Sequence, residues 1–281
     1  MKRKKSKFRV VISNTFACIL TLLIVILYLF LGFSFGVFND RSILSKLDES
    51  NYYNKVYENY FENEVKIVQE SGFPKQVLEE AVPFDKIYVG GKNYVNNILA
   101  GEAAQINTIK LRNALTDSMN RYLTEQGIVR TNELNAGIEV LITELENNYV
   151  DSIQLQFVNY YKEYKSKFLD LMKIAIPIDL ILIGLLCFFL IRMHRFKHRG
   201  MRYINYASIA SSCLILVTAI YLLLIKKYMA IDVNPEYYQK FLTAYFKWDI
   251  IVFLYIGGSG LTISAFLITL TGYLRKKVAN G

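Results

Sequence analysis

The chain has 281 residues, of which 53% are hydrophobic, and its formal net charge is +9 at pH 7. A basic balance can indicate nucleic-acid binding, but a mean hydropathy of +0.24 points first to a membrane. The three cysteines are too few and too dispersed for a disulfide framework, so the position of the charges along the chain decides the class.

Four uncharged or nearly uncharged apolar runs predict four transmembrane helices. A helix rises about 1.5 Å per residue, and the hydrocarbon core is roughly 30 Å thick. The runs are long enough to cross it, the second only just; their bounds are 10–38, 174–191, 203–225 and 250–274. The predicted class is therefore an all-α membrane protein with a helical extracytoplasmic domain inserted between its first and second spans.

Basic residues gather in three short segments beside the spans. The head 1–9 has six Lys or Arg, the turn 192–202 has five and the tail 275–281 has three, and none of the three segments contains Asp or Glu. Cytoplasmic loops are enriched in Lys and Arg, so both termini are expected in the cytoplasm. Segments 39–173 and 226–249, with 19 basic and 23 acidic residues, are expected outside, and Lys226 and Lys227 are mild exceptions. The charge thus reflects topology, and no nucleic-acid partner is expected.

The first run is expected to stay in the protein as an anchor. It is longer than the core of a usual signal peptide, and SFGVFND offers no small-x-small cleavage site.

Segment 39–173 is predicted to be a helical bundle whose first and last helices continue the first two spans. Apolar residues recur every three or four positions along 53–68, 111–122 and 134–145, and the segment that follows enters the second span without Pro or Gly. Pro74 and Pro83 bracket a short helix, KQVLEEAV, while Gly101 and Gly127 separate longer ones. Such a domain can pass motion to the membrane or act as a rigid ectodomain, and both alternatives stay open.

Residues 86–95, KIYVGGKNYV, resist the helical interpretation. Two β-prone arms flank Gly90 and Gly91, and this pattern fits a two-residue hairpin and a helix break equally well. The spacing does not fit a phosphate-binding loop.

The second outer segment, 226–249, predicts an amphipathic helix. Asn234, Pro235 and Glu236 form a suitable helix start. Aromatic and apolar residues then share one side, and the interface with lipid headgroups is their expected place: Tyr238, Phe241, Leu242, Tyr245 and Trp248. The alternative is that this helix packs beneath the outer domain.

The reactive residue types do not form a catalytic set. Cys18, Cys187 and Cys213 all fall in predicted spans, and His194 and His198 both lie in the cytoplasmic turn. No metal site, cofactor or Ser-His or Cys-His chemistry is therefore expected on the outer side. The cysteines are interpreted as packing residues and the histidines as turn residues near lipid headgroups.

Asp179 is the charged residue inside an apolar run and is the candidate intramembrane functional residue. The structural alternative is a local contact with Lys173, Lys226 or Lys227. Small residues on the third and fourth spans are candidates for helix packing, either with each other or with a partner's helix: Ala207, Ser208, Ser211, Ser212, Gly257, Gly260 and Ser264.

The predicted cytoplasmic segments are too short for a kinase, nucleotidase or DNA-binding domain. The favoured hypothesis is a noncatalytic accessory, sensory or scaffold protein that binds a ligand or envelope partner outside and couples to another membrane protein. A small oligomeric transporter or channel using Asp179 is the alternative. An envelope enzyme using carboxylates such as Glu62 and Glu64 is a third class.

The segment SGFPKQVLEEAV, Ser71 to Val82, together with the four-span layout, resembles an uncharacterised family of integral membrane proteins from low-GC Gram-positive bacteria. The resemblance implies a plasma membrane that faces a cell wall, and it carries no activity.

Overall fold

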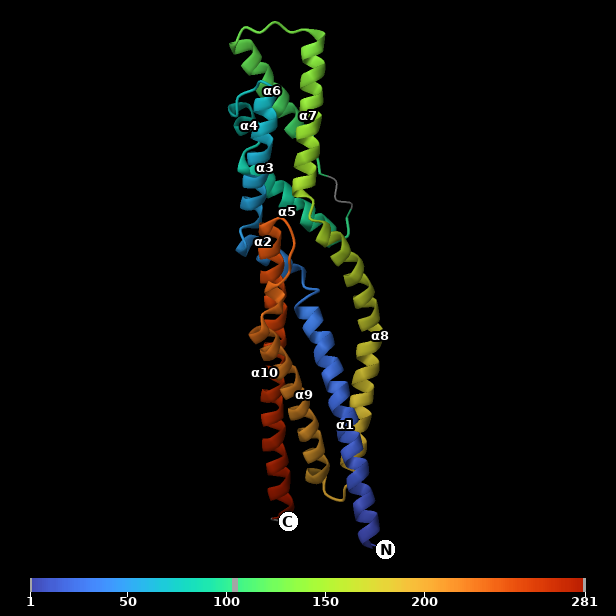
Figure 1. Cartoon of the computed structure of the whole chain (residues 1–281). Helices are drawn as coiled ribbons and strands as arrows, with labels where there is room; N and C mark the ends of the chain where they lie inside the picture. The colour runs from blue at the N-terminus through green and yellow to red at the C-terminus, as the bar shows by residue number, and fades with distance from the viewer. Residues whose placement is uncertain (1, 103–105, 280–281) are drawn as a thin grey trace. The chain divides into compact units, whose positions relative to one another are not determined.

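The computed structural model describes residues 2–102 and 106–279, and all regular structure in these residues is helical (Figure 1). The α-helices are α1 Lys2–Phe35, α2 Asp40–Glu49, α3 Tyr52–Glu70, α4 Gln76–Ala81, α5 Phe84–Ala100, α6 Ile109–Glu125, α7 Asn132–Ile153, α8 Gln156–Arg192, α9 Lys197–Ile225 and α10 Glu236–Ala279. A 3-10 turn, Lys227–Met229, follows α9. The predicted all-α class is confirmed.

Four of these helices are long and apolar enough to cross a membrane, as predicted. The candidate spans are Phe8–Phe35 of α1, Phe157–Arg192 of α8, Lys197–Ile225 of α9 and Glu236–Lys277 of α10. All four helices begin before the predicted apolar runs, because charged and polar residues at the run ends do not stop a helix. At the other end α1 stops at Phe35, short of the predicted bound at residue 38.

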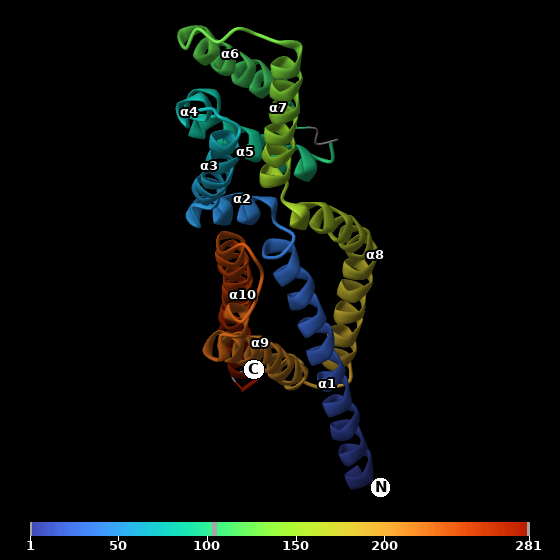
Figure 2. The ribbon, with the colours of Figure 1, turned by 45° about the horizontal axis from the view of Figure 1, so that its top comes forward.

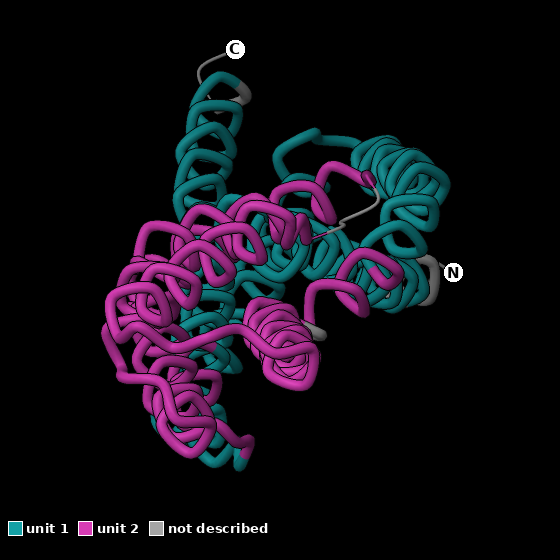
Figure 3. The backbone as a smooth tube through the Cα atoms, turned by 90° about the horizontal axis from the view of Figure 1, so that it is seen from above, with its two compact units in different colours: residues 1–42, 165–232, 242–281 teal, residues 43–164, 233–241 magenta. Residues whose placement is uncertain are grey.

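The chain forms two compact units (Figure 3). Unit 1 contains residues 1–42, 165–232 and 242–281, and unit 2 contains residues 43–164 and 233–241. Three helices have residues in both units: α2 passes from unit 1 into unit 2 after Ser42, while α8 passes from unit 2 into unit 1 after Tyr164 and α10 does so after Phe241.

Unit 2 is built around α3, which packs against α4, α5 and α7 (Figure 2). The predicted periodicity is confirmed, since Val56, Tyr60 and Val68 are buried on one face of α3. Tyr60 is 1% exposed, and its hydroxyl donates to the Leu145 carbonyl of α7 at 3.1 Å. A fully buried hydroxyl needs such a partner, so this bond fixes how α3 and α7 meet.

An ion-pair network joins α6 to α7 in the same unit. Arg112 contacts Glu139 at 2.8 Å and Glu146 at 2.5 Å. The inner faces of these two helices are apolar, and their side chains are buried in unit 2: Leu115, Met119, Ile142 and Leu145. The burial of these side chains adds hydrophobic stabilisation to the ion pairs.

Residues 86–95 are the clearest departure from the sequence-based expectation. They lie inside α5 with no hairpin and no helix break. A side chain at Gly91 would meet the Tyr53 ring at 2.6 Å, and one at Gly90 would meet the Tyr149 hydroxyl at 2.9 Å. The two glycines therefore allow α5 to approach α3 and α7 closely, a tertiary constraint that outweighs local propensity.

The predicted continuity of the bundle with the spans is correct at one end and wrong at the other. α8 enters the second span without interruption, although it begins at Gln156 after a break at the extended residue Gln154. The first span ends at Phe35, and a separate helix, α2, starts at Asp40. The Asn39 side chain accounts for this restart, because its oxygen accepts from the Arg41 amide at 3.1 Å.

Unit 1 is centred on α1 and α9, which pack along each other. A buried cluster of Leu20, Leu190, Met201, Ile204 and Ala207 joins α1, α8 and α9. Aromatic rings extend this packing: Phe38, which follows α1, stacks on Phe168 of α8 at 4.5 Å, and Phe33 of α1 meets Phe253 of α10 at 5.5 Å.

The close approach at Gly91 makes a stability prediction. Gly91→Ala should destabilise the protein by about 1–3 kcal/mol, because its methyl group would overlap the buried Tyr53 ring. Gly137→Ala in α7 is the matched control, since nothing lies within 4 Å of its added carbon. The control should be neutral or stabilising by about 0.5–1 kcal/mol. Thermal unfolding in lipid nanodiscs, followed by circular dichroism, measures both, and equal effects of the two changes would contradict this packing.

Candidate functional site

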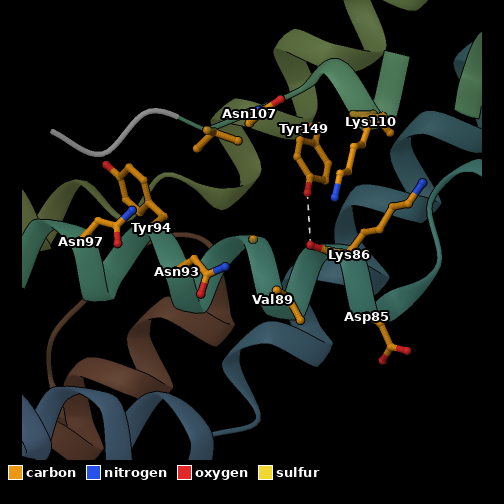
Figure 4. Close-up of a pocket in the computed structure, with 12 residues that line it drawn as sticks. Asp85, Lys86, Val89, Asn93, Tyr94, Asn97, Asn107, Lys110 and Tyr149 are labelled. Atoms are coloured by element: carbon orange, nitrogen blue, oxygen red, sulfur yellow. Dashed lines mark hydrogen bonds between the residues drawn. The ribbon is translucent and has the colours of Figure 1, made fainter. Parts of the chain in front are cut away.

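Unit 2 contains a cavity of about 510 Å³ between α5 and the start of α6 (Figure 4). Tyr149 of α7 forms one wall. Eight of the lining side chains are polar: two amines, one carboxylate, three amides and two phenols, from Lys86, Lys110, Asp85, Asn93, Asn97, Asn107, Tyr94 and Tyr149.

The helical repeat of α5 explains why these groups meet. Lys86, Gly90, Asn93 and Asn97 follow one another at spacings of four, three and four residues, so they share one face of α5, and Val89 borders that face. The helix turns its opposite, apolar side toward the core, where Ile87, Val95 and Ile98 are buried. This helix face was missed at the sequence level because the segment was expected to be a hairpin or a break.

The hydrogen bonds around the cavity leave several donors uncommitted. The Tyr149 hydroxyl donates to the Lys86 carbonyl at 3.2 Å, and burial raises the pKa of Tyr149 to about 12. The Lys86 amine donates to the Ala81 carbonyl at 2.8 Å, and partial burial lowers the pKa of Lys86. In Figure 4 the side chains of Lys110 and Tyr149 both point toward α5, while the Asp85 carboxylate points away from them.

A second, more open cavity of about 830 Å³ in unit 2 is acidic and rich in amides. Glu64 is its most buried carboxylate, at 3% exposure, and the Asn148 amide donates to both of its oxygens at 3.1 Å. Burial raises the pKa of Glu64, and the amide opposes this shift. Glu62, the other carboxylate named for an envelope enzyme, is exposed and does not line this cavity, so the two do not form a facing pair.

Asp179 is buried in unit 1 at 5% exposure. Neither carboxylate oxygen has a hydrogen-bond partner within residues 2–102 and 106–279. The expected local contact with Lys173 is absent, because Lys173 pairs instead with Asp170 at 2.7 Å. Lys226 and Lys227 make no contact with it in the described part of the chain.

Asp249 is a second buried carboxylate in unit 1. It is also 5% exposed and lacks a hydrogen-bond partner among the described residues. A side chain at Gly36 would lie 3.2 Å from its Oδ1 atom. Unpaired buried carboxylates are costly, which makes both positions notable within apolar helices.

Several small residues of the third and fourth spans lie where α9 and α10 meet, and one packs toward α1. The Ser208 and Ser264 hydroxyls are 2.7 Å apart, and both Ser211 and Ser212 donate to the Ser208 carbonyl. Gly260 faces Ser212, and Gly257 faces Leu216 of α9. Ala207 belongs to the cluster with Leu20 of α1.

A further polar contact between α9 and α10 was not predicted from the sequence. The Asn205 amide donates to the Thr271 hydroxyl at 3.0 Å. An Asn inside an apolar run was the available signal, because such a group seeks a partner on a neighbouring helix.

The aromatic residues predicted to lie at the interface are mostly buried in protein. Phe241 and Tyr245 are 0% exposed and Leu242 is 7% exposed, whereas Tyr238 and Trp248 are half-buried. Phe241 packs against Tyr52 and Phe157 at ring distances of 5.9 and 6.0 Å. These positions favour packing against protein over contact with lipid headgroups.

Two hydrogen bonds within unit 1 strengthen that conclusion. The Tyr245 hydroxyl donates to the Val37 carbonyl, and the Trp248 indole donates to Ser42 at 3.1 Å. The start of α10 is thus tied to the segment that follows α1.

The histidines do not converge on a site. His194 Nε2 lies 3.1 Å from the Ser13 hydroxyl, and its ring stacks on Tyr203 at 5.4 Å. Burial lowers the pKa of His194, as do the charges of Arg9 and Arg199. The three cysteines are free, and no group of His, Cys, Asp and Glu suited to a metal occurs in the described ranges.

The contact between α9 and α10 predicts an asymmetry between two neighbouring glycines. Gly260→Ala should lower the unfolding temperature, because its methyl group would come within 2.4 Å of the Ser212 hydroxyl and 2.5 Å of the Tyr28 hydroxyl. The cost expected for such overpacking is about 1–3 kcal/mol. Gly258→Ala is the control, with nothing within 4 Å. Thermal unfolding of both variants in nanodiscs checks this, and an unaffected Gly260→Ala protein would contradict the packing.

No protein-family model, curated protein or solved structure matches this chain. The roles proposed below therefore rest on the chemistry of its own residues.

Proposed function

We propose that the chain is a noncatalytic accessory or sensory membrane protein. In this proposal the domain formed by unit 2 lies outside the membrane and binds a ligand or envelope partner. The four long helices cross the membrane and couple to another membrane protein. The single observation that carries it is the continuity of α8 and α10, each of which has residues in both compact units.

Continuous helices are suited to transmit force because their backbone hydrogen bonds resist bending. α8 runs for 37 residues and α10 for 44 residues, with Pro177 of α8 as a point of weakness inside the span region. An ordering or shift of unit 2 on binding would therefore reach the spans as a tilt or rotation of these two helices. A scaffold function uses the same helices without motion.

The proposed location is a plasma membrane, with both termini cytoplasmic and residues 39–173 outside. The clusters of Lys and Arg beside the spans support this orientation. The resemblance of Ser71 to Val82 supports a Gram-positive cell, where the outer domain would face the cell wall. The short cytoplasmic segments imply that any output passes through a partner, which is a transporter, kinase or envelope component.

A small oligomeric transporter or channel is the second candidate. The observation that favours it is the absence, within the described residues, of any hydrogen-bond partner for the buried Asp179 carboxylate. Intramembrane carboxylates without a partner are suited to carry a proton or a cation.

Mass spectrometry of the tagged chain, purified from its native membrane in mild detergent, tests the accessory function. We expect a second membrane protein in stoichiometric amount that is absent from untagged membranes. A homo-oligomer without any partner would contradict the accessory function and shift support to the transporter.

A substitution separates the two candidates further. Under the accessory function, Asp179→Asn leaves partner recovery unchanged, as does the exposed control Asp170→Asn. Loss of a gradient-driven activity in Asp179→Asn alone, at an unchanged level of folded protein, would establish the transporter instead.

A further inference from the structure

We propose that the cavity between α5 and α6 binds a small organic acid, through its carboxylate and an adjoining amide or hydroxyl group. This inference deepens the proposed function by naming the class of ligand that unit 2 would recognise. It rests on that function for its biological meaning, whereas its test measures binding alone.

Uncommitted polar groups are the first argument. Within the described residues, the Lys110 amine and the side-chain amides of Asn93 and Asn97 have no hydrogen-bond partner. Asn107 uses its oxygen to accept from the Ile109 amide at 3.0 Å, which leaves its NH₂ group free to donate. Three amides and one ammonium with unused donors thus line a single cavity, where Asn97 is half-buried and the other three groups are open to solvent (Figure 4).

The charged side chains around the cavity favour a negatively charged ligand. Lys86 and Lys110 both line it, and Asp85, its one acidic neighbour, turns its carboxylate away from Lys110 in Figure 4. The Lys86 amine is held by the Ala81 carbonyl, so its charge acts at a distance while Lys110 is free for direct contact. One free ammonium matches one negative charge, and a charge-assisted bond of this kind is stronger than a neutral one.

The Asn side chains determine which group should stand next to the carboxylate in the ligand. Each amide can both donate and accept, so Asn93 and Asn97 match an amide or hydroxyl group in the same ligand. They stand one helical turn apart on α5 and so present two such groups side by side.

The apolar lining and the volume of the cavity further restrict the ligand. Val89, Ile106 and Leu111 line the cavity beside the Tyr94 ring and can cover a small apolar substituent. Gly90 also lines the cavity, and an added Cβ there would lie 2.9 Å from the Tyr149 hydroxyl. A volume of about 510 Å³ falls within the range of roughly 300–1,000 Å³ that is typical of small-molecule sites.

Calorimetric titration of the full chain in phosphatidylcholine nanodiscs tests the proposal. The probes are N-acetylalanine, N-acetyltyrosine and N-acetylglutamate, which share a carboxylate and an amide and differ in their side chains. At least one should bind saturably with 1:1 stoichiometry. The neutral N-acetylalaninamide should bind about tenfold more weakly than N-acetylalanine or not at all.

Variants locate the binding. Lys110→Gln should weaken binding of the best probe about tenfold, because it removes the charge and keeps a donor. Lys66→Gln, on the exposed face of α3 and away from the cavity, is the matched control and should bind as the parent does. Val89→Trp, at a rim position that is 52% exposed, should block the cavity sterically without altering its charge.

Three results would overturn the proposal: no saturable binding of any acid, equal binding of N-acetylalanine and its amide, or equal effects of Lys110→Gln and Lys66→Gln. The unfolding temperature of each variant is measured beside the titration, so that only folded protein is compared. Because no partner protein takes part, failure here leaves the partner-recovery experiment unaffected.

Discussion

The hydrocarbon core of a membrane offers no water to backbone amides and carbonyls, and this constraint governs the chain. Each spanning segment has to satisfy its hydrogen bonds internally, which a helix does. The four long helices α1, α8, α9 and α10 meet that demand over 28, 36, 29 and 42 residues. Since α8 and α10 do not stop at the ends of their apolar runs, the same hydrogen-bond ladder continues into residues of unit 2.

The hydrophobic effect contributes little between helices that are surrounded by lipid, so helices in unit 1 are held together by close packing and polar contacts. Close approach at Gly260 and Gly257 and the Ser208 to Ser264 contact hold α9 against α10. Unit 2 relies on burial instead, around Tyr60, Leu115 and Leu145. The two units thus use different physical means of cohesion, as expected if one is surrounded by lipid and the other by water.

The sequence was sufficient for features that depend on one segment at a time. Apolar runs identified the four long helices, and the period of Val56, Tyr60 and Val68 identified the buried face of α3. The sequence was insufficient where the local structure depends on residues that are far away along the chain. Gly90 and Gly91 suggest a turn or a break in isolation, but they lie within a helix because Tyr149 and Tyr53 pack directly against them. Asp179 lacks the contact with a lysine that the nearby sequence suggested. The cavity beside α5 was not foreseen for the same reason, because it is lined by residues of three helices.

The central claim is that unit 2 faces the outside while the turn between α8 and α9 faces the cytoplasm. Single cysteines at Lys110, Glu139 and Arg195, in a chain whose Cys18, Cys187 and Cys213 are replaced by alanine, test it in intact cells with a membrane-impermeant thiol reagent. All three positions are exposed, so access depends on the side of the membrane alone. The account predicts labelling at positions 110 and 139 and none at 195 until the cells are opened. Labelling at 195, with protection at 110 and 139, would contradict it.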